Sequence, residues 1–214
     1  AAVVEQNFNA VDQAMGNLAM VTVPAAVSGS LRRQPAMSPR APEYVREVLG
    51  KVAARQGDSL PVSQMSTDGT FPSNTSQYEK RNIALEIPKW DTELCIQCGK
   101  CSFACPHAAI RQKVYPEAAL AGAPETFKHT PARFKLIEGG QFAIQVAPED
   151  CTGCGVCVAV CPGIDKQDPT RKALTLTPQP EVRAQEAANW DFFLSLPEVD
   201  RKQLNLNLVR DSQF

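Results

Sequence analysis

The sequence predicts an α+β fold with a pseudo-twofold repeat, and three observations predict it. All eight cysteines lie in two runs of identical spacing, one starting at position 95 and the other 56 residues later, at position 151. Segments that alternate apolar and polar residues lie close to both runs, which is typical of short strands. One longer segment with helical periodicity follows the second run. Strands beside two equivalent runs indicate two related halves.

The cysteine spacing identifies the kind of site. The first run is Cys95-Ile-Gln-Cys98-Gly-Lys-Cys101-Ser-Phe-Ala-Cys105-Pro106, and the second is Cys151-Thr-Gly-Cys154-Gly-Val-Cys157-Val-Ala-Val-Cys161-Pro162. Each has the spacing C-x2-C-x2-C-x3-C-P of bacterial ferredoxins. A cluster of iron and sulfide needs four thiolates from different directions. One tight loop can supply three of them, and the fourth must come from elsewhere.

The assignment of the ligands follows a precedent, because spacing alone does not establish it. In two-cluster ferredoxins the fourth cysteine of each run ligates the other cluster. We therefore expect one [4Fe–4S] cluster on Cys95, Cys98, Cys101 and Cys161. We expect the second on Cys151, Cys154, Cys157 and Cys105. Neither cluster would then be built by one half alone.

Apolar neighbours of the two runs are expected to exclude water from the clusters. This predicted lining consists of Ile96, Phe103, Ala109, Ile110, Val156, Val158 and Val160. Trp90 precedes the first run. Ordinary core packing is the favoured interpretation for its ring, and shielding of the first cluster is the alternative.

Two other uses of eight cysteines are less consistent with the pattern. Disulfide frameworks are typical of short secreted domains. Zinc sites use C-x2-C pairs separated by a longer gap, without a third cysteine two residues on. Iron–sulfur ligation is therefore the favoured interpretation.

Composition excludes several function classes. The chain has 214 residues, 43% of them hydrophobic, and a formal net charge of −1. This balance gives no indication of nucleic-acid or membrane binding, and no apolar run approaches the roughly 20 residues of a membrane span. Thiolate ligands indicate a reducing compartment, most simply the cytoplasm.

Two segments are expected to precede the cluster module. Residues 1–23 predict the C-terminal edge of an upstream α/β domain, with strands at 2–4 and 19–23 and a helix at 9–17. Residues 24–82 are rich in proline and turn residues, which predicts an extended linker or small wrapping domain. Within it, one helix is expected from residue 43 to about 55, with an apolar face of Tyr44, Val45, Val48, Leu49 and Val52.

The module itself is expected to span residues 83–197. Strands are predicted at 83–87, as an edge strand before Pro88, and at 111–115, 141–146 and 172–177. A loop with a short helix at 117–121 is expected between the runs. A helix is predicted at 181–196, with an apolar face of Val182, Ala188, Trp190, Phe193 and Leu194. Residues 198–214 are polar with interspersed leucines, and we expect a connector to a downstream domain that is missing here.

Several segments resemble the pyruvate:ferredoxin (flavodoxin) oxidoreductase family. Residues 60–63 (Leu-Pro-Val-Ser), 68–72 (Asp-Gly-Thr-Phe-Pro) and 78–81 (Tyr-Glu-Lys-Arg) are similar to the linker before its iron–sulfur domain. Residues 95–110 and 146–151 are similar to its cluster runs, and residues 189–198 and 212–214 to the segment that leads into its thiamine-binding domain. The resemblance covers nearly the whole chain.

The resemblance implies that the chain is an internal fragment of a large enzyme that oxidatively decarboxylates pyruvate with coenzyme A. It implies thiamine diphosphate, Mg²⁺ and a third [4Fe–4S] cluster in residues beyond Phe214. It also implies ferredoxin or flavodoxin as the electron acceptor, contacts with other domains of the same chain, and a homodimer at full length. The fragment would relay single electrons and would not turn over pyruvate.

Three other functions stay open at this point. A polyferredoxin-type electron-carrier subunit would carry the same runs without a thiamine-binding domain. A different 2-oxoacid or sulfite-type oxidoreductase would use the same module with another substrate. A zinc-binding interaction module is the third alternative.

Overall fold

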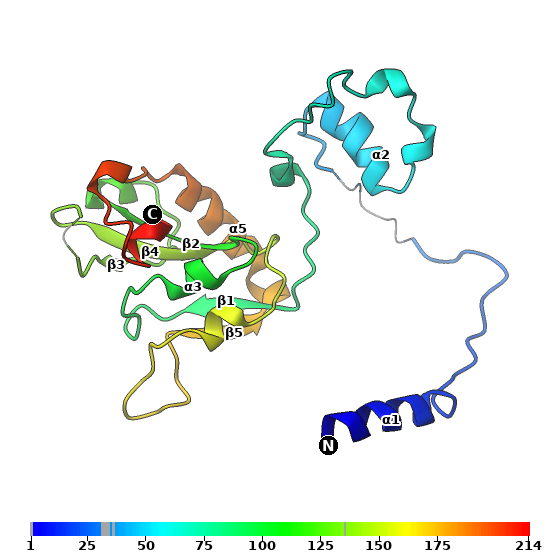
Figure 1. Ribbon diagram of the computed structural model, residues 1–214, viewed down its shortest axis with the longest axis horizontal. Coiled ribbons are helices and arrows are strands. Elements are labelled where there is room, and N and C mark those ends of the chain that lie inside the picture. The colour runs from blue at the N-terminus through cyan, green and yellow to red at the C-terminus, as the bar shows by residue number, and fades with distance from the viewer. Residues whose placement is uncertain (1, 31–34, 36, 135) are drawn as a thin grey trace. The chain divides into compact units, whose positions relative to one another are not determined.

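The computed structural model describes residues 2–30, 35, 37–134 and 136–214. The chain forms two compact units, Ala1–Gln34 and Pro35–Phe214. Within these ranges, the first unit contains helix α1 (Ala2–Ala14), and the second contains the other helices and five strands (Figure 1). Each unit is described separately below.

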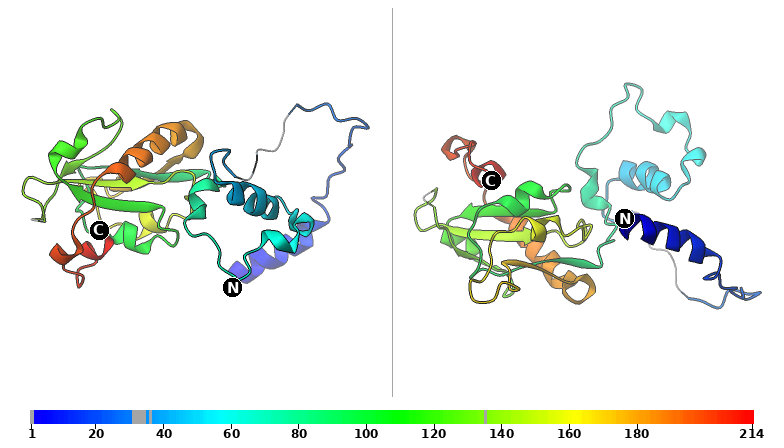
Figure 2. Two further views of the ribbon diagram at one scale, coloured as in Figure 1. Left: turned by 90° about the horizontal axis from the view of Figure 1, so that it is seen from above. Right: turned by 60° about the horizontal axis from the view of Figure 1, so that its bottom comes forward.

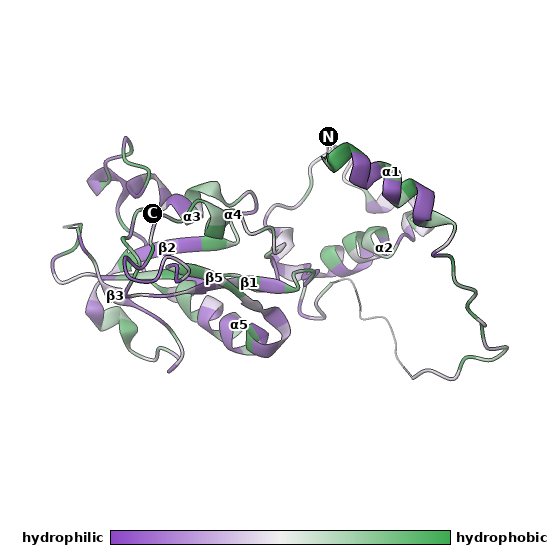
Figure 3. Cartoon of the chain, turned by 90° about the horizontal axis from the view of Figure 1, so that it is seen from below, coloured by the Kyte–Doolittle hydropathy of each residue, from purple (hydrophilic) through white to green (hydrophobic). Residues whose placement is uncertain are grey.

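Helix α1 replaces the first strand expected from the sequence. The α/β pattern of two strands around a helix at 9–17 is therefore wrong, because residues 2–14 are helical and 18–23 have no regular structure. A strand needs a hydrogen-bonded neighbour, and the described residues provide none here, whereas a helix bonds its own backbone. Hydrophobic and hydrophilic residues alternate along α1 (Figure 3), and none of its side chains is buried.

The second unit begins with a small helical segment. The helix expected from residue 43 is present as π-helical turns at Val45–Leu49 that continue into α2 (Gly50–Ala53). Val45 and Val48 are buried as predicted, but Val52 is 52% exposed and lies outside the core. Short 3₁₀ helices follow at Gly57–Ser59, Val62–Gln64 and Thr75–Tyr78.

A minor core holds this segment together. Met37 and Ala41 pack with Val45, and Leu49, Ala53 and Tyr78 cover them. The backbone N–H of Ser38 donates to the carbonyl of Tyr78 at 3.0 Å and so joins the two ends of the segment. The residues between them are mostly exposed.

The first sheet pairs the first and last strands of the chain. Strand β1 (Glu86–Trp90) runs antiparallel to β5 (Leu174–Pro178), and Pro88 lies opposite Leu176. The predicted strand at 83–87 therefore begins three residues too early. Pro88 belongs to β1, because a strand paired on one side only does not need every backbone N–H. Strand β5 also starts later than predicted, since Lys172 forms an isolated bridge with Ile164.

The second sheet has the order β2-β4-β3, and all its pairs are antiparallel. Strands β2 (Ile110–Tyr115) and β4 (Gln141–Val146) match the predicted segments at 111–115 and 141–146. The intervening insert carries a 3₁₀ helix at Glu117–Leu120 and strand β3 (Thr130–Pro131). Every residue of β4 is buried, because β4 is central and α5 packs against it (Figure 2).

Helix α5 (Gln179–Ser195) confirms the helix predicted at 181–196 and docks on this module. Trp190 and Phe193 are buried as predicted, but Leu194 is 49% exposed and Ala188 is also exposed. The buried face includes Asn189 instead, which accepts a hydrogen bond from the hydroxyl of Thr126 in the insert at 3.0 Å. The hydrogen bond to the insert keeps Asn189 on the buried face of α5. This face therefore differs from the one that the apolar pattern predicts, which includes Leu194.

The last segment packs against the module, and its role as a connector stays a prediction. The ring of Phe214 lies 5.5 Å from that of Phe134 and 6.4 Å from that of Phe142, between centroids. Asp211 is buried and pairs with Arg210 at 2.7 Å. In Figure 1 the C-terminus accordingly lies beside β2 and β4.

Within the described ranges, no helix combines the length and the apolar character that crossing a membrane requires.

The burial pattern of α5 gives a test of the core. We expect Phe193→Ala to lower the free energy of unfolding by about 3–5 kcal/mol, because it removes a fully buried ring. The neighbouring Leu194→Ala is the control, with a change of about 0.5 kcal/mol, since that side chain is half exposed. Anaerobic urea unfolding followed by circular dichroism measures both. Equal effects would show that Phe193 is not a core residue.

Candidate metal centres

The two cysteine runs fold in the same way. Each follows a strand, β1 or β4, and each leads into a short helix, α3 (Lys100–Ala104) or α4 (Val156–Ala159). The residue before each helix is a glycine with positive φ, Gly99 at 75° and Gly155 at 73°. Only glycine adopts this left-handed conformation without a steric cost. The equivalent glycines thus set the same bend between the second and third cysteines of each run.

Backbone N–H groups point at the cysteine sulfurs. Gln97 and Gly153 occupy the same place in their runs, with φ of 56° and 71°. Their N–H groups donate to Cys95 Sγ and Cys151 Sγ, each at 3.4 Å. The N–H of Ala109 donates to Cys105 Sγ at 3.3 Å. Such donors stabilise negative charge on sulfur.

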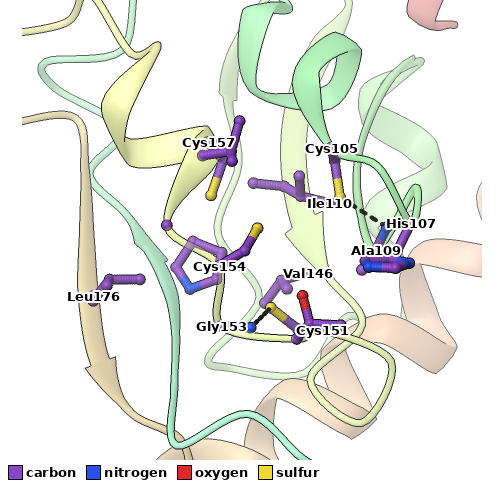
Figure 4. Close-up of a pocket in the computed structure, with 14 residues that line it drawn as sticks. Cys105, His107, Ala109, Ile110, Val146, Cys151, Gly153, Cys154, Cys157 and Leu176 are labelled. Carbon is purple, nitrogen blue, oxygen red and sulfur yellow. Dashed lines mark hydrogen bonds between the residues drawn. The ribbon is translucent and has the colours of Figure 1, made fainter. Parts of the chain in front are cut away.

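Four cysteines surround one pocket, of about 400 Å³ of empty space: Cys105, Cys151, Cys154 and Cys157. Three come from the second run, and Cys105 is the last cysteine of the first. Figure 4 shows their sulfur atoms around a common space, with Ile110 and Val146 beside it. We call this the second pocket.

The other four cysteines surround an equivalent pocket of about 320 Å³: Cys95, Cys98, Cys101 and Cys161. Here the first run provides three residues and the second run provides Cys161. We call this the first pocket. The helices that follow the two loops, α3 and α4, are in contact with each other. The structure therefore brings together the same two sets of cysteines that the ferredoxin precedent predicts, while their ligation of iron stays a prediction.

Four of these thiols, those of Cys95, Cys101, Cys151 and Cys157, resist ionisation in the metal-free protein. Burial raises the pKa of Cys101 to about 12 and that of Cys157 to about 11. Burial also raises the pKa of Cys95 and of Cys151. In each case neighbouring cysteines of the same group raise it further, because several thiolates in one pocket repel each other. Positive charge within the pocket offsets this repulsion.

An iron–sulfur cluster fits both pockets by this chemistry. The iron ions of the cluster supply positive charge beside the four thiolates, and soft thiolates are the usual ligands of such clusters. All eight cysteines are free thiols in the structure. Each group offers four sulfurs around a space lined mainly by carbon, with backbone N–H donors behind the sulfurs. This arrangement can hold an anionic cluster and tune its potential.

The predicted apolar lining is only partly correct. Ala109 and Ile110 are buried, and both line the second pocket. Ile96 lines the first pocket but is 53% exposed, and Phe103 is 64% exposed and lines neither. Phe103 points outward because α3 turns its inner face, with Cys101 and Ser102, toward the core.

The insert between the runs covers the first run through one buried side chain. Gln97 is 2% exposed, and its amide nitrogen donates to the carbonyl of Pro131 at 2.9 Å. Its amide oxygen accepts from the N–H of Arg133 at 2.8 Å. The equivalent Gly153 has no side chain, so the second run lacks this attachment.

The C-terminal segment covers the first run from another direction. Gln112 donates from its side chain to the carbonyl of Arg210 at 2.7 Å. A Cβ on Gly99 would lie 2.8 Å from the Cα of Arg210, so glycine is also required there for space. In the second run, nothing lies within 4 Å of the same position on Gly155. The second run is accordingly the more open, and Cys154 is the one exposed cysteine.

The sequence pattern does not identify Gln97, Gln112 and Arg210 as parts of the site. The first cysteine run has Gln97 at the position where the second run has Gly153, and this difference is the available signal. Gln112 and Arg210 gave none, because their contact joins residues 98 positions apart.

Two family models match the chain. Residues 94–163 match the 4Fe-4S dicluster domain, and residues 30–84 match EKR, a domain of unknown function. The first match and the eight cysteines support two [4Fe–4S] clusters.

Known proteins match nearly the whole chain. It is 54% identical to the putative pyruvate-flavodoxin oxidoreductase of Synechocystis sp. and 50% identical to the pyruvate-flavodoxin oxidoreductase of Nostoc sp.. It is 46% identical to the pyruvate:ferredoxin oxidoreductase of Moorella thermoacetica. Each match covers 99% of this chain and 18% of the relative's length. These matches confirm the family resemblance seen in the sequence.

Serine substitutions test the two cysteine groups. We expect Cys105→Ser to remove the same cluster as Cys151→Ser, because both residues line the second pocket. Cys161→Ser should instead reproduce Cys95→Ser. Each variant should lose about half of its iron, and electron paramagnetic resonance (EPR) of the reduced proteins compares the clusters that remain. A Cys105→Ser spectrum equal to that of Cys95→Ser would contradict the exchange.

Proposed function

We propose that this chain, which is homologous over nearly its whole length to a segment of the pyruvate-flavodoxin oxidoreductases, is the electron-transfer segment of such an enzyme. The observation that carries the proposal is the division of eight cysteines into two groups of four, each completed by the opposite run. The proposed ligands are Cys95, Cys98, Cys101 and Cys161 for one cluster and Cys105, Cys151, Cys154 and Cys157 for the other.

The whole enzyme has further parts in this proposal. The chain spans 18% of the length of the first relatives that it matches, so most of their residues lie outside it. We assign thiamine diphosphate, Mg²⁺ and a third [4Fe–4S] cluster to residues beyond Phe214. The full-length protein would oxidise pyruvate in the cytoplasm as a homodimer and pass electrons to ferredoxin or flavodoxin.

When bound, the two clusters accept and release single electrons between the thiamine chemistry and the external carrier. This chain's residues make that exchange possible in three ways. The cysteine thiolates hold the iron. The N–H groups of Gln97, Ala109 and Gly153 stabilise negative charge on the sulfurs. Buried residues such as Ile110 and Leu174 keep water away.

The pseudo-twofold relation between the halves is part of the proposal. Strand β1 precedes the first run and pairs with β5, which follows the second. Strand β4 precedes the second run and pairs with β2, which follows the first. The reciprocal pairing of strands and the reciprocal use of Cys105 and Cys161 support a common twofold plan.

The segment before the module is proposed to act as a wrapping linker. Lys80 pairs with Asp150 at 2.5 Å, and the N–H of Asn82 donates to the carbonyl of Glu149 at 3.1 Å. Both contacts lie directly before the second run. The largely exposed residues between positions 56 and 77 are then available to neighbouring domains of the full-length enzyme.

Metal analysis tests the cofactor. Purified without oxygen, the chain should contain about eight iron and eight sulfide atoms. Reduction by dithionite should give the EPR signal of two interacting clusters. Zinc in place of iron, or paired disulfides without metal, would overturn the proposed function.

Turnover separates the enzyme from a stand-alone carrier. The 214-residue chain, reduced by dithionite, should reduce flavodoxin, but it should not consume pyruvate because it lacks the proposed thiamine site. The full-length protein should do both with coenzyme A present. A full-length protein that carries electrons but decarboxylates no 2-oxoacid would favour a polyferredoxin-type subunit.

A further inference from the structure

Trp90 is held firmly at the wall of the first pocket. It is the last residue of β1 and is 5% exposed. Trp90 lines the pocket together with Cys95 and three other cysteines. The ring of Phe142 meets it edge to face at 6.0 Å between centroids, and Lys128 Nζ donates to its backbone carbonyl at 2.5 Å. Both the ring and the backbone of Trp90 are therefore fixed.

The indole N–H has no acceptor in the described part of the chain. Trp90 Nε1 is fully buried and makes no hydrogen bond there. An indole nitrogen can only donate, and a buried donor without an acceptor is unfavourable. A residue that lines the pocket of four cysteines thus carries an unused donor.

The first pocket offers this donor the sulfur atoms of four cysteines, which line the pocket together with Trp90. A donor beside a cysteine sulfur favours negative charge on that sulfur once iron is bound.

The second pocket lacks this donor. Trp90 lies five positions before Cys95, and Val146 lies five positions before Cys151. Val146 lines the second pocket just as Trp90 lines the first. The repeated halves therefore place a hydrogen-bond donor beside one site and an alkyl side chain beside the other.

We propose that the indole N–H of Trp90 donates a hydrogen bond to a cysteine sulfur of the cluster in the first pocket and raises that cluster's reduction potential. Reduction adds one electron and therefore negative charge to the cluster and its sulfurs. A hydrogen bond to sulfur stabilises the reduced form more than the oxidised form. The inference rests on the proposed function, since it requires a cluster in the first pocket.

Trp90→Phe is the direct test, because it removes the N–H and keeps an aromatic ring. EPR-monitored redox titration of the anaerobic 214-residue chain should show a lower midpoint potential for the first-pocket cluster. We expect a change of about tenfold in its reduction equilibrium, which is ~59 mV for one electron. The midpoint of the second-pocket cluster should not change.

Trp190→Phe is the matched control. Trp190 is the other tryptophan, is 9% exposed and stacks on Phe193 at 5.5 Å between centroids. It lines neither cysteine pocket. The same substitution there should leave both midpoints unchanged.

A second replacement separates the donor from the ring volume. In the Trp190→Phe background, the remaining tryptophan can be replaced by 3-benzothienylalanine, which keeps the two fused rings but has sulfur in place of N–H. The first-pocket midpoint should fall as it does in Trp90→Phe. Electron–nuclear double resonance of the protein with natural tryptophan should also detect an exchangeable proton coupled to the first-pocket cluster, and this coupling should be lost on replacement.

The outcomes distinguish this inference from the proposed function. Two clusters whose midpoints stay unchanged with benzothienylalanine overturn the role of Trp90 and leave the proposed function intact. Equal shifts of both midpoints also overturn it, because a general change in packing would act on both sites. A native chain without any cluster signal overturns both conclusions.

Discussion

The packing of the second unit depends on a reciprocal arrangement in which each cysteine run provides one cysteine to the pocket of the other run. Cys105 lies at the end of the first run but lines the pocket of the second, and Cys161 does the reverse. Helices α3 and α4 must therefore lie in contact, and the strands on either side pair across the halves rather than within them. Metal binding to such a site contributes to folding, because neither set of four thiols is complete within one half.

The two halves share a backbone plan but differ in their surroundings. The first run is covered by the insert through Gln97 and by the C-terminal segment through Arg210, and it has the indole of Trp90 at its wall. The second run has Gly153 where the first has Gln97, and Val146 where the first has Trp90. Nothing lies within 4 Å of a Cβ placed on Gly155, and Cys154 is exposed. Exposure and hydrogen bonding to sulfur both affect cluster potentials. Two sites of the same ligand type can therefore differ in potential within one small module.

Local patterns predicted some elements well and others poorly. Strands β2 and β4 are predicted correctly because their alternating residues lie between clear turn signals. Helix α5 is predicted correctly because its helical pattern extends over many residues. The pattern predicts strand β1 three residues too early, because Pro88 suggests a strand end although a strand with one partner accepts proline. The Ala-Val-Val sequence predicts a strand at residues 2–4, yet a strand requires a partner that the sequence pattern does not reveal.

The sequence by itself determined the chemistry, because cysteine spacing places three sulfurs on one loop whatever surrounds it. It also carried the family resemblance, which does not depend on packing. Only the tertiary structure decided which cysteine completes each group, which face of α5 is buried, and that residues 198–214 return to cover the first run. These features depend on contacts such as Gln112 with Arg210 and Asn189 with Thr126. Such contacts join residues far apart in the chain, and no local periodicity encodes them.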